Sequence, residues 1–78
     1  MQAYSSGEEV RLGDVVTWPG DQGTIIALEA DLPRWGLTKE ASVGKVMIRF
    51  SKTGLVCEES GSEDLRLVRR ADEKAQAP

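Results

Sequence analysis

Acidic side chains are the first candidates for chemistry in this sequence, because the chain contains no histidine. Histidine is the commonest general base and the commonest zinc ligand, so its absence removes both roles. Asp21 with Asp31, or the carboxylates of EESGSED at 58–64, could in principle form an acid pair or bind a hard cation. A calcium loop, however, needs oxygen ligands at alternating positions and a closing glutamate, an order that EESGSED lacks. We therefore expect solvated acidic turns, no metal site and no cofactor.

The single cysteine, Cys57, is the only thiol, and no histidine is present to activate it. A cysteine among apolar neighbours usually behaves as a small buried hydrophobe, so we expect a structural thiol and no catalytic residue. One cysteine allows no intramolecular disulfide, which is typical of a reducing compartment. No apolar stretch approaches the roughly 20 residues that span a bilayer, and the N-terminal stretch does not resemble a signal peptide. We expect a soluble cytoplasmic protein that is not an enzyme.

The two tryptophans are candidates for binding or for the core. Trp18 ends an apolar stretch just before Pro19, which favours a position at the edge of the core. Trp35 follows Arg34 in an irregular part of the sequence, and tryptophan and arginine are the residues enriched in interface hot spots. Two interpretations stay open for Trp35: a lid folded onto the core, or an exposed anchor for a partner.

A third candidate surface lies on the strand KVMIRF at 45–50. Met47 and Arg49 alternate with apolar residues there, so we expect both on the outer face, where an exposed methionine is weak evidence for a contact surface. The candidate partner-binding residues are Arg34, Trp35, Met47 and Arg49. Arg66, Arg69 and Arg70 are expected to be mainly a solvated strand end. The alternative is a local basic patch that they form with Lys45 and Arg49, the one place where nucleic acid could dock.

The elements that position these residues are predicted to be strands. Short runs rich in β-branched residues alternate with glycine-containing turns, and we expect five strands, at 15–18, 24–30, 45–50, 55–59 and 65–70. Pro19, Gly20 and Asp21 mark a hairpin turn. The predicted core consists of Val16, Trp18, Ile26, Leu28, Val46, Ile48, Phe50, Leu55, Leu65 and Leu67.

The rest of the chain is predicted to be irregular. Residues 31–43 form one long loop in which Pro33 and Gly36 interrupt any regular element, apart from a helical turn at 38–41. Residues 1–9 are expected to be a loosely held arm whose Tyr4 packs back on the body. We expect one domain at 10–70 and a disordered tail at 71–78, which has no apolar residue larger than alanine.

Four segments together carry a family resemblance: RLGDVV, GDQGTI, KVMIRF followed by SKTG, and EDLRLV. In this order they resemble the small Src-homology-3-like β-barrels, which include KOW, Tudor and related bacterial modules. The likeness covers residues 10–70, and Gly13, Gly20, Gly23 and Gly54 match the tight corners of such barrels. It implies an all-β fold, a small five-stranded barrel, and a binding role without a specified ligand.

Two functional interpretations follow. The first is a non-catalytic protein-interaction module that uses the 31–43 loop, such as a small accessory or toxin-neutralising (immunity-like) bacterial protein. The alternative is a KOW-type barrel that binds nucleic acid or ribonucleoprotein. The net charge of −3 makes nucleic acid the less favoured partner, because phosphate binding usually requires a basic footprint. No membrane partner is expected.

Overall fold

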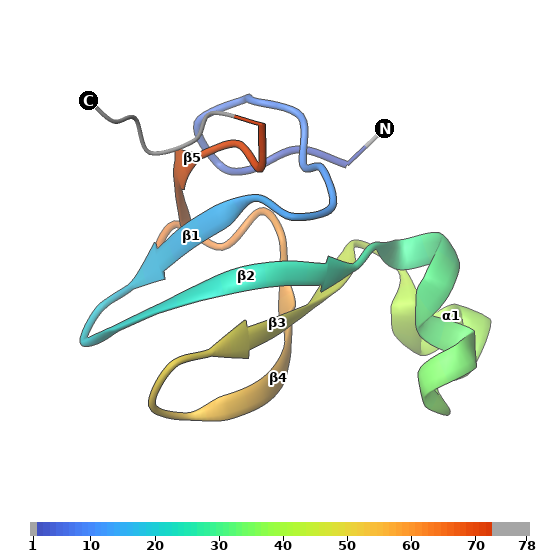
Figure 1. Cartoon of the computed structure of the whole chain (residues 1–78). Coiled ribbons are helices and arrows are strands. Elements are labelled where there is room, and N and C mark those ends of the chain that lie inside the picture. The colour runs from blue at the N-terminus through green and yellow to red at the C-terminus, as the bar shows by residue number, and fades with distance from the viewer. Residues whose placement is uncertain (1, 73–78) are drawn as a thin grey trace.

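The protein is all-β, as the sequence predicts. The computed structural model describes residues 2–72, in which five antiparallel strands form one sheet (Figure 1). Their order across the sheet is β4-β3-β2-β1-β5. The strands are β1 (Val15–Trp18), β2 (Asp21–Ala27), β3 (Lys45–Phe50), β4 (Gly54–Glu59) and β5 (Arg66–Arg69). Within residues 2–72, β4 and β5 are the two edge strands of the sheet and do not pair with each other.

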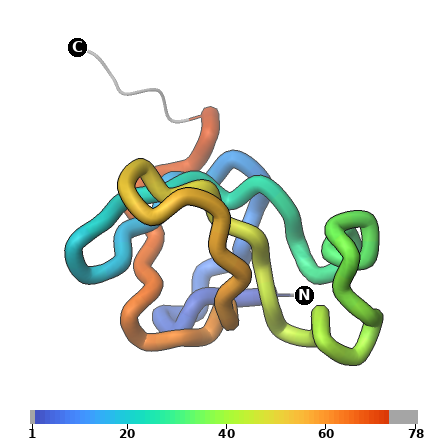
Figure 2. The backbone as a smooth tube through the Cα atoms, turned by 90° about the horizontal axis from the view of Figure 1, so that it is seen from below, coloured from blue at the N-terminus to red at the C-terminus, as the bar shows by residue number. Residues whose placement is uncertain are grey.

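Tight turns join the strands at the predicted places. Gly20, between β1 and β2, has φ 89°, and Gly54, at the start of β4, has φ 92°. These left-handed conformations favour glycine because it has no Cβ. The sheet curves round a central core, and Figure 2 shows this curvature along the backbone.

The main core lies on the inner face of the sheet. It contains Tyr4, Val10, Val16, Ile25, Val46, Ile48, Phe50 and Leu65. Trp18, Leu28 and Leu67 are partly buried against this cluster, and the Trp18 ring meets the Phe50 ring edge-on at 6.4 Å between centroids. Most of the predicted core is therefore confirmed.

The assignment of Ile26 and Leu55 to the core is wrong. In both cases the strand phase, that is, which of two neighbouring side chains faces the core, was predicted incorrectly. Ile25 lies opposite Ile48 while Ala27 lies opposite Met47, so β2 carries a bulge and Ile25 replaces Ile26 in the main core. In β4, Val56 lies opposite Ile48 and packs against the core, which leaves Leu55 51% exposed. A shift of one residue moves every side chain of a strand to the other face.

A second, smaller core lies on the outer face of the sheet. It contains Ala27, Leu32 and Met47, with Ile26, Leu37 and Cys57 partly buried against it. Leu32 belongs to the 3₁₀ helix η1 (Glu29–Trp35), which is followed by the short helix α1 (Lys39–Ser42). Both figures show these helices grouped at one end of the sheet.

The prediction of an irregular loop at 31–43 is therefore only partly right. Pro33 lies inside η1 and does not prevent it, because the φ of proline, near −65°, fits a 3₁₀ helix. Gly36 then ends η1 in a left-handed conformation, with its N–H donating to the Pro33 carbonyl. The predicted turn at 38–41 corresponds to α1, where the Thr38 hydroxyl accepts a hydrogen bond from the Ala41 N–H at 3.0 Å.

The N-terminal arm is part of the folded body and is not loosely held. Tyr4 is 2% exposed and packs in the main core, as expected, and Ala3 pairs with Glu9 in an isolated β-bridge. The Gln2 side chain bonds to the chain at Glu29, Lys45 and Ser60. At the other end, the predicted tail at 71–78 falls largely on residues 73–78, which lie outside the described residues.

Across residues 2–72, no helix combines the length and the apolar character needed to cross a membrane.

Candidate functional site

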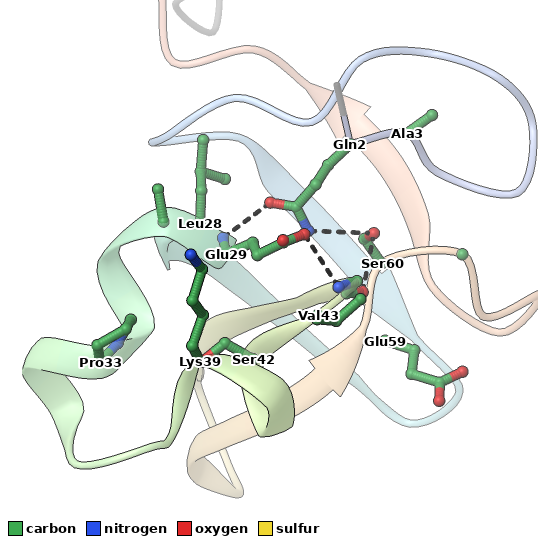
Figure 3. A pocket seen from close by; sticks show the side chains of 13 residues that line it. Gln2, Ala3, Leu28, Glu29, Pro33, Lys39, Ser42, Val43, Glu59 and Ser60 are labelled. Atoms are coloured by element: carbon green, nitrogen blue, oxygen red, sulfur yellow. Dashed lines mark hydrogen bonds between the residues drawn. The ribbon is translucent and has the colours of Figure 1, made fainter.

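An open groove of about 1150 Å³ lies beside the two helices. Four segments meet there, namely the N-terminal arm, η1, the α1 region and the turn after β4 (Figure 3). The N-terminal arm, the two neighbouring helices and the turn after β4 are far apart in the sequence, and the fold brings them together at one end of the molecule. A second groove, beside Trp18 and Phe50, is smaller, at about 320 Å³.

The amide of Gln2 holds the groove together. Its Oε1 accepts a hydrogen bond from the Glu29 N–H at 2.8 Å, and its Nε2 donates to the Lys45 carbonyl at 3.0 Å. The same Nε2 lies 3.4 Å from the Ser60 hydroxyl, to which it donates. One side chain thereby links the arm to η1, β3 and the turn after β4 at the base of the groove.

Glu29 provides the second polar link at this base. Its Oε1 accepts a hydrogen bond from the Gly44 N–H at 3.0 Å, which ties the start of η1 to the end of the α1 region. Its other carboxylate oxygen makes no hydrogen bond within residues 2–72. That oxygen is available to an N–H donor of a bound molecule.

Apolar groups and one cation form the walls. Leu28, Pro33 and Val43 line the groove, and Val43 is 63% exposed. The Lys39 side chain runs along the wall, while the Glu59 carboxylate points away from it (Figure 3). Such a surface can bind a partner through apolar contact, with the Lys39 ammonium group and the Glu29 carboxylate to orient the partner.

The serine hydroxyls at the groove serve the fold. Ser42 Oγ donates to the Thr38 carbonyl at 2.8 Å, and Ser60 Oγ donates to the Gly44 carbonyl at 3.3 Å. A nucleophilic serine needs an adjacent general base that takes its proton, and main-chain carbonyls cannot do so. Neither Ser42 nor Ser60 is therefore activated by these hydrogen bonds.

The structure places Arg34 and Trp35 together at the end of η1, both exposed. Trp35 is 43% exposed and belongs to neither core cluster. Leu32, which is fully buried, is the η1 residue that packs on the sheet. Of the two interpretations of Trp35, the structure agrees with the exposed side chain and not with the lid.

The expectation that Met47 is exposed is wrong. Met47 does point to the outer face, as predicted, but η1 covers that part of the face and leaves Met47 8% exposed. Arg49 lies two residues further along β3, beyond this cover, and is exposed. The four predicted partner-binding residues therefore do not form one continuous surface.

The groove itself was not predicted from the sequence. Gln2 contacts residues 27, 43 and 58 positions away along the chain, and nothing in the local pattern near Gln2 indicates such contacts. Glu29 was assigned to the end of a strand, whereas it begins η1. Only the length of the 31–43 segment pointed towards this end of the molecule.

A buried polar network anchors the arm next to β1. Asp14, which is fully buried, accepts hydrogen bonds at Oδ2 from the Tyr4 hydroxyl at 2.6 Å, the Arg11 N–H at 2.9 Å and Arg70 Nη1 at 2.9 Å. Burial, and then the hydrogen bond to the Asp14 carboxylate, raise the pKa of Tyr4 above its usual range. Asp14 also forms a buried ion pair with Arg70, so it links the arm, β1 and the end of β5.

The acidic residues weighed as metal ligands do not converge. Within residues 2–72, no group of three or more histidine, cysteine, aspartate or glutamate residues is placed to hold a metal ion. Cys57 is half-buried against the smaller core. The predictions that the protein needs no metal and performs no catalysis stay predictions.

No family model, curated protein or solved structure matches this chain. Its function must therefore be argued from the geometry of its surfaces.

Proposed function

We propose that this protein is a non-catalytic protein-interaction module whose groove receives a segment of a partner polypeptide. The groove, at about 1150 Å³, exceeds the roughly 300–1,000 Å³ typical of small-molecule sites, and it is open rather than enclosed. Apolar walls with a few polar groups at the base suit an extended polypeptide, whose N–H groups can donate to Glu29 and whose carboxylates can pair with Lys39.

The observation that carries this proposal is the exposure of Trp35 beside the groove. Pro33 lines the groove, and Trp35 follows it by two residues at the end of the same helix. η1 is held to the sheet by Leu32, so Trp35 is not needed to fix the helix. An exposed tryptophan next to an arginine, on an anchored element, has the composition of an interface hot spot.

The first test concerns the free protein. In a Trp18→Phe background only Trp35 emits, and we expect a red-shifted fluorescence spectrum that acrylamide quenches readily. The control is the Trp35→Phe variant, in which Trp18 is partly buried against Phe50 and should be quenched less. A blue-shifted, protected Trp35 signal would remove the main support for the proposal.

The second test identifies the partner and measures its affinity. Capture from the native cell is done in parallel with the wild type, Trp35→Ala, Val43→Asp and the control Leu55→Ala. A partner of the groove is retained by the wild type and by Leu55→Ala, and lost with the other two variants. With that partner purified, Trp35→Ala should weaken binding by about 2 kcal/mol, roughly 30-fold, without lowering the melting temperature. Equal retention by all four proteins would contradict the proposal.

We also infer that the curved sheet is a small Src-homology-3-like barrel, the finer fold that the sequence resemblance implies. The strand order, with β5 beside β1 at one edge and β4 at the other, and the enclosed inner core support this inference. The edge strands β4 and β5 do not pair within the described residues, so the inferred barrel is open along this seam. Amide hydrogen exchange tests the seam: the outward N–H groups of β4 and β5 should exchange rapidly, and slow exchange in both strands would contradict an open seam.

A further inference from the structure

The outer face of the sheet carries three arginines on the part that η1 leaves uncovered. Residues directly opposite each other on neighbouring strands share a face. Arg49 lies opposite Thr24, Thr24 opposite Val15, and Val15 opposite Arg69, which places Arg49 and Arg69 on one face across four strands. Arg66 lies opposite Thr17 in the next row of the same face. We call Arg49, Arg66 and Arg69, with the uncharged residues between them, the arginine face.

The charges of the arginine face are not neutralised by the chain itself. Within residues 2–72, none of the three arginines makes an ion pair or a side-chain hydrogen bond. The strand positions between them carry no carboxylate and consist of Val15, Thr17, Gln22 and Thr24, and Leu55 lies beside Arg49 on the edge strand β4. The chain as a whole has a net charge of −3, so this concentration of positive charge is local.

We propose that the arginine face binds an acidic segment of a partner polypeptide. Guanidinium groups bind carboxylates through two parallel hydrogen bonds, which a lysine ammonium cannot do. Val15, between Arg49 and Arg69, and Leu55, which is 51% exposed beside Arg49, add apolar contact to the arginines, a combination typical of protein interfaces.

The spacing of the arginines fits an extended segment. Three residues along β5 place Arg66 and Arg69 about 10 Å apart, and three strand spacings place Arg49 and Arg69 about 14 Å apart. In an extended chain, residues two and four positions apart share a face and lie about 7 and 13 Å apart. Glutamate or aspartate at alternating positions can therefore reach two or three of the arginines together.

A nucleic acid fits this face less well than a polypeptide does. Single strands bind largely by stacking bases on aromatic side chains, and the arginine face has none. The net charge of −3 also opposes the long-range approach of a nucleic acid, which is a large polyanion. A short acidic polypeptide segment interacts mainly with charges within a Debye length, about 8 Å, and these are the charges of the arginines.

This proposal does not rest on the groove, because no residue of the arginine face lines it. The test uses fluorescence anisotropy with three labelled probes: a peptide of alternating glutamate and serine, its glutamine–serine counterpart, and an oligodeoxythymidine. We expect the full-length wild-type protein to bind the glutamate peptide at low salt, to lose affinity as salt rises, and not to bind the glutamine peptide.

Two triple variants with equal charge change locate the site. Arg49→Gln with Arg66→Gln and Arg69→Gln should bind the glutamate peptide at least about tenfold more weakly than the wild type. Arg11→Gln with Lys52→Gln and Lys74→Gln removes the same charge and changes no residue assigned to the groove or to the arginine face, and this variant should bind within about twofold of the wild type. Thermal melts check that both triple variants fold. If the first triple variant does not fold, the single variant Arg49→Gln replaces it, and we expect this variant also to bind the glutamate peptide more weakly than the wild type.

Three results would overturn the proposal: no binding of the glutamate peptide by the wild type, equal losses in the two triple variants, or tighter arginine-dependent binding of the oligodeoxythymidine. The last would make the arginine face a nucleic-acid site. Because Trp35→Ala leaves this face intact, it should bind the glutamate peptide normally, so failure of the groove proposal and failure of this one are distinguishable.

Discussion

A single carboxylate, that of Asp21, organises the turn between β3 and β4. It accepts hydrogen bonds from the Ser51 hydroxyl at 2.7 Å, the Lys52 N–H at 3.1 Å and the Thr53 N–H at 2.9 Å. Desolvation is the largest single influence and raises the pKa of Asp21, but the hydrogen bonds from Ser51, Gln22 and Thr53 together hold the pKa well below its usual range. Asp21, weighed above as part of an acid pair, is thus used by the fold.

The depressed pKa of Asp21 predicts a loss of stability in acid. Because the carboxylate titrates at lower pH in the folded protein than in the unfolded chain, its stabilising contribution is complete above about pH 4 and is lost as the pH falls towards the folded pKa. Asp21→Asn has no such charge. Urea denaturation should therefore show a stability advantage of the wild type over Asp21→Asn at pH 6 that shrinks between pH 4 and pH 2.

The matched control for Asp21 is Glu40→Gln, because Glu40 is exposed and makes no hydrogen bond through its side chain within the described chain. It should differ little from the wild type in stability at any pH. A wild-type advantage over Asp21→Asn that stays constant from pH 6 to pH 2 would show that the hydrogen bonds to the Asp21 carboxylate do not depend on its charge.

At the scale of elements, β2 and β3 approach each other closely at Gly23. A Cβ at this position would lie 2.8 Å from the Arg49 carbonyl oxygen, 2.8 Å from Ile48 Cγ2 and 2.9 Å from Phe50 Cδ1. Gly23 was assigned to a turn from the sequence, but it lies within β2 and its φ is not left-handed. The position requires glycine because of this contact with β3 and not because of a turn.

Gly23→Ala should therefore destabilise the protein by about 1–3 kcal/mol through overpacking. The control is Gly61→Ala, where a Cβ would have no neighbour within 4 Å and the φ is not left-handed. That substitution should stabilise slightly, by up to about 1 kcal/mol, because it restricts the unfolded chain. Both values come from the urea midpoint, and equal effects at the two positions would mean that β2 and β3 are further apart than described.

The phase of β4 predicts a contrast between Ile48 and Leu55. Ile48 is fully buried in the main core, so Ile48→Ala should cost about 2–5 kcal/mol by leaving a cavity. Leu55 is 51% exposed, so Leu55→Ala should change stability by no more than about 0.5 kcal/mol. A large loss with Leu55→Ala, measured by thermal or urea denaturation, would restore the sequence-based assignment of Leu55 to the core.

At the scale of the whole molecule, the N-terminal arm closes one side of the core. Tyr4 packs among the core residues and bonds to the buried Asp14, while Gln2 links the arm to three other segments. Small domains have thin cores, so the contribution of one buried aromatic residue is a large fraction of the total stability.

Tyr4→Ala should therefore cost about 3–5 kcal/mol, as for other large aromatic side chains, and removal of residues 1–9 should abolish cooperative folding. The control is removal of residues 73–78, for which the sequence predicts no change in melting temperature, since they have no large apolar side chain to bury. Circular dichroism during heating gives both results. A cooperative transition at the wild-type temperature after removal of the arm would mean that it is dispensable.

The sequence by itself determined where the strands lie and most of the inner core. β1 and β3 were placed correctly because β-branched residues and a period of two are local signals, and Val46, Ile48 and Phe50 alternate clearly with polar neighbours. The turn at Gly20 was also predictable from the sequence, because proline, glycine and aspartate favour a turn wherever they occur together. Ile25–Ile26 and Leu55–Val56 are adjacent apolar pairs, so alternation could not decide which member faces the core.

Only the tertiary structure decided the strand phases, the position of η1 and the makeup of both candidate surfaces. η1 lies over Met47 because the Leu32 side chain is buried there. The free energy gained by this burial depends on the neighbouring strand β3 and not on the residues around Pro33. The groove depends on Gln2 meeting residues up to 58 positions away, and the arginine face depends on the register of four strands. Local sequence patterns do not predict such contacts, because these contacts join distant residues and contribute to the free energy of folding only once the sheet has formed.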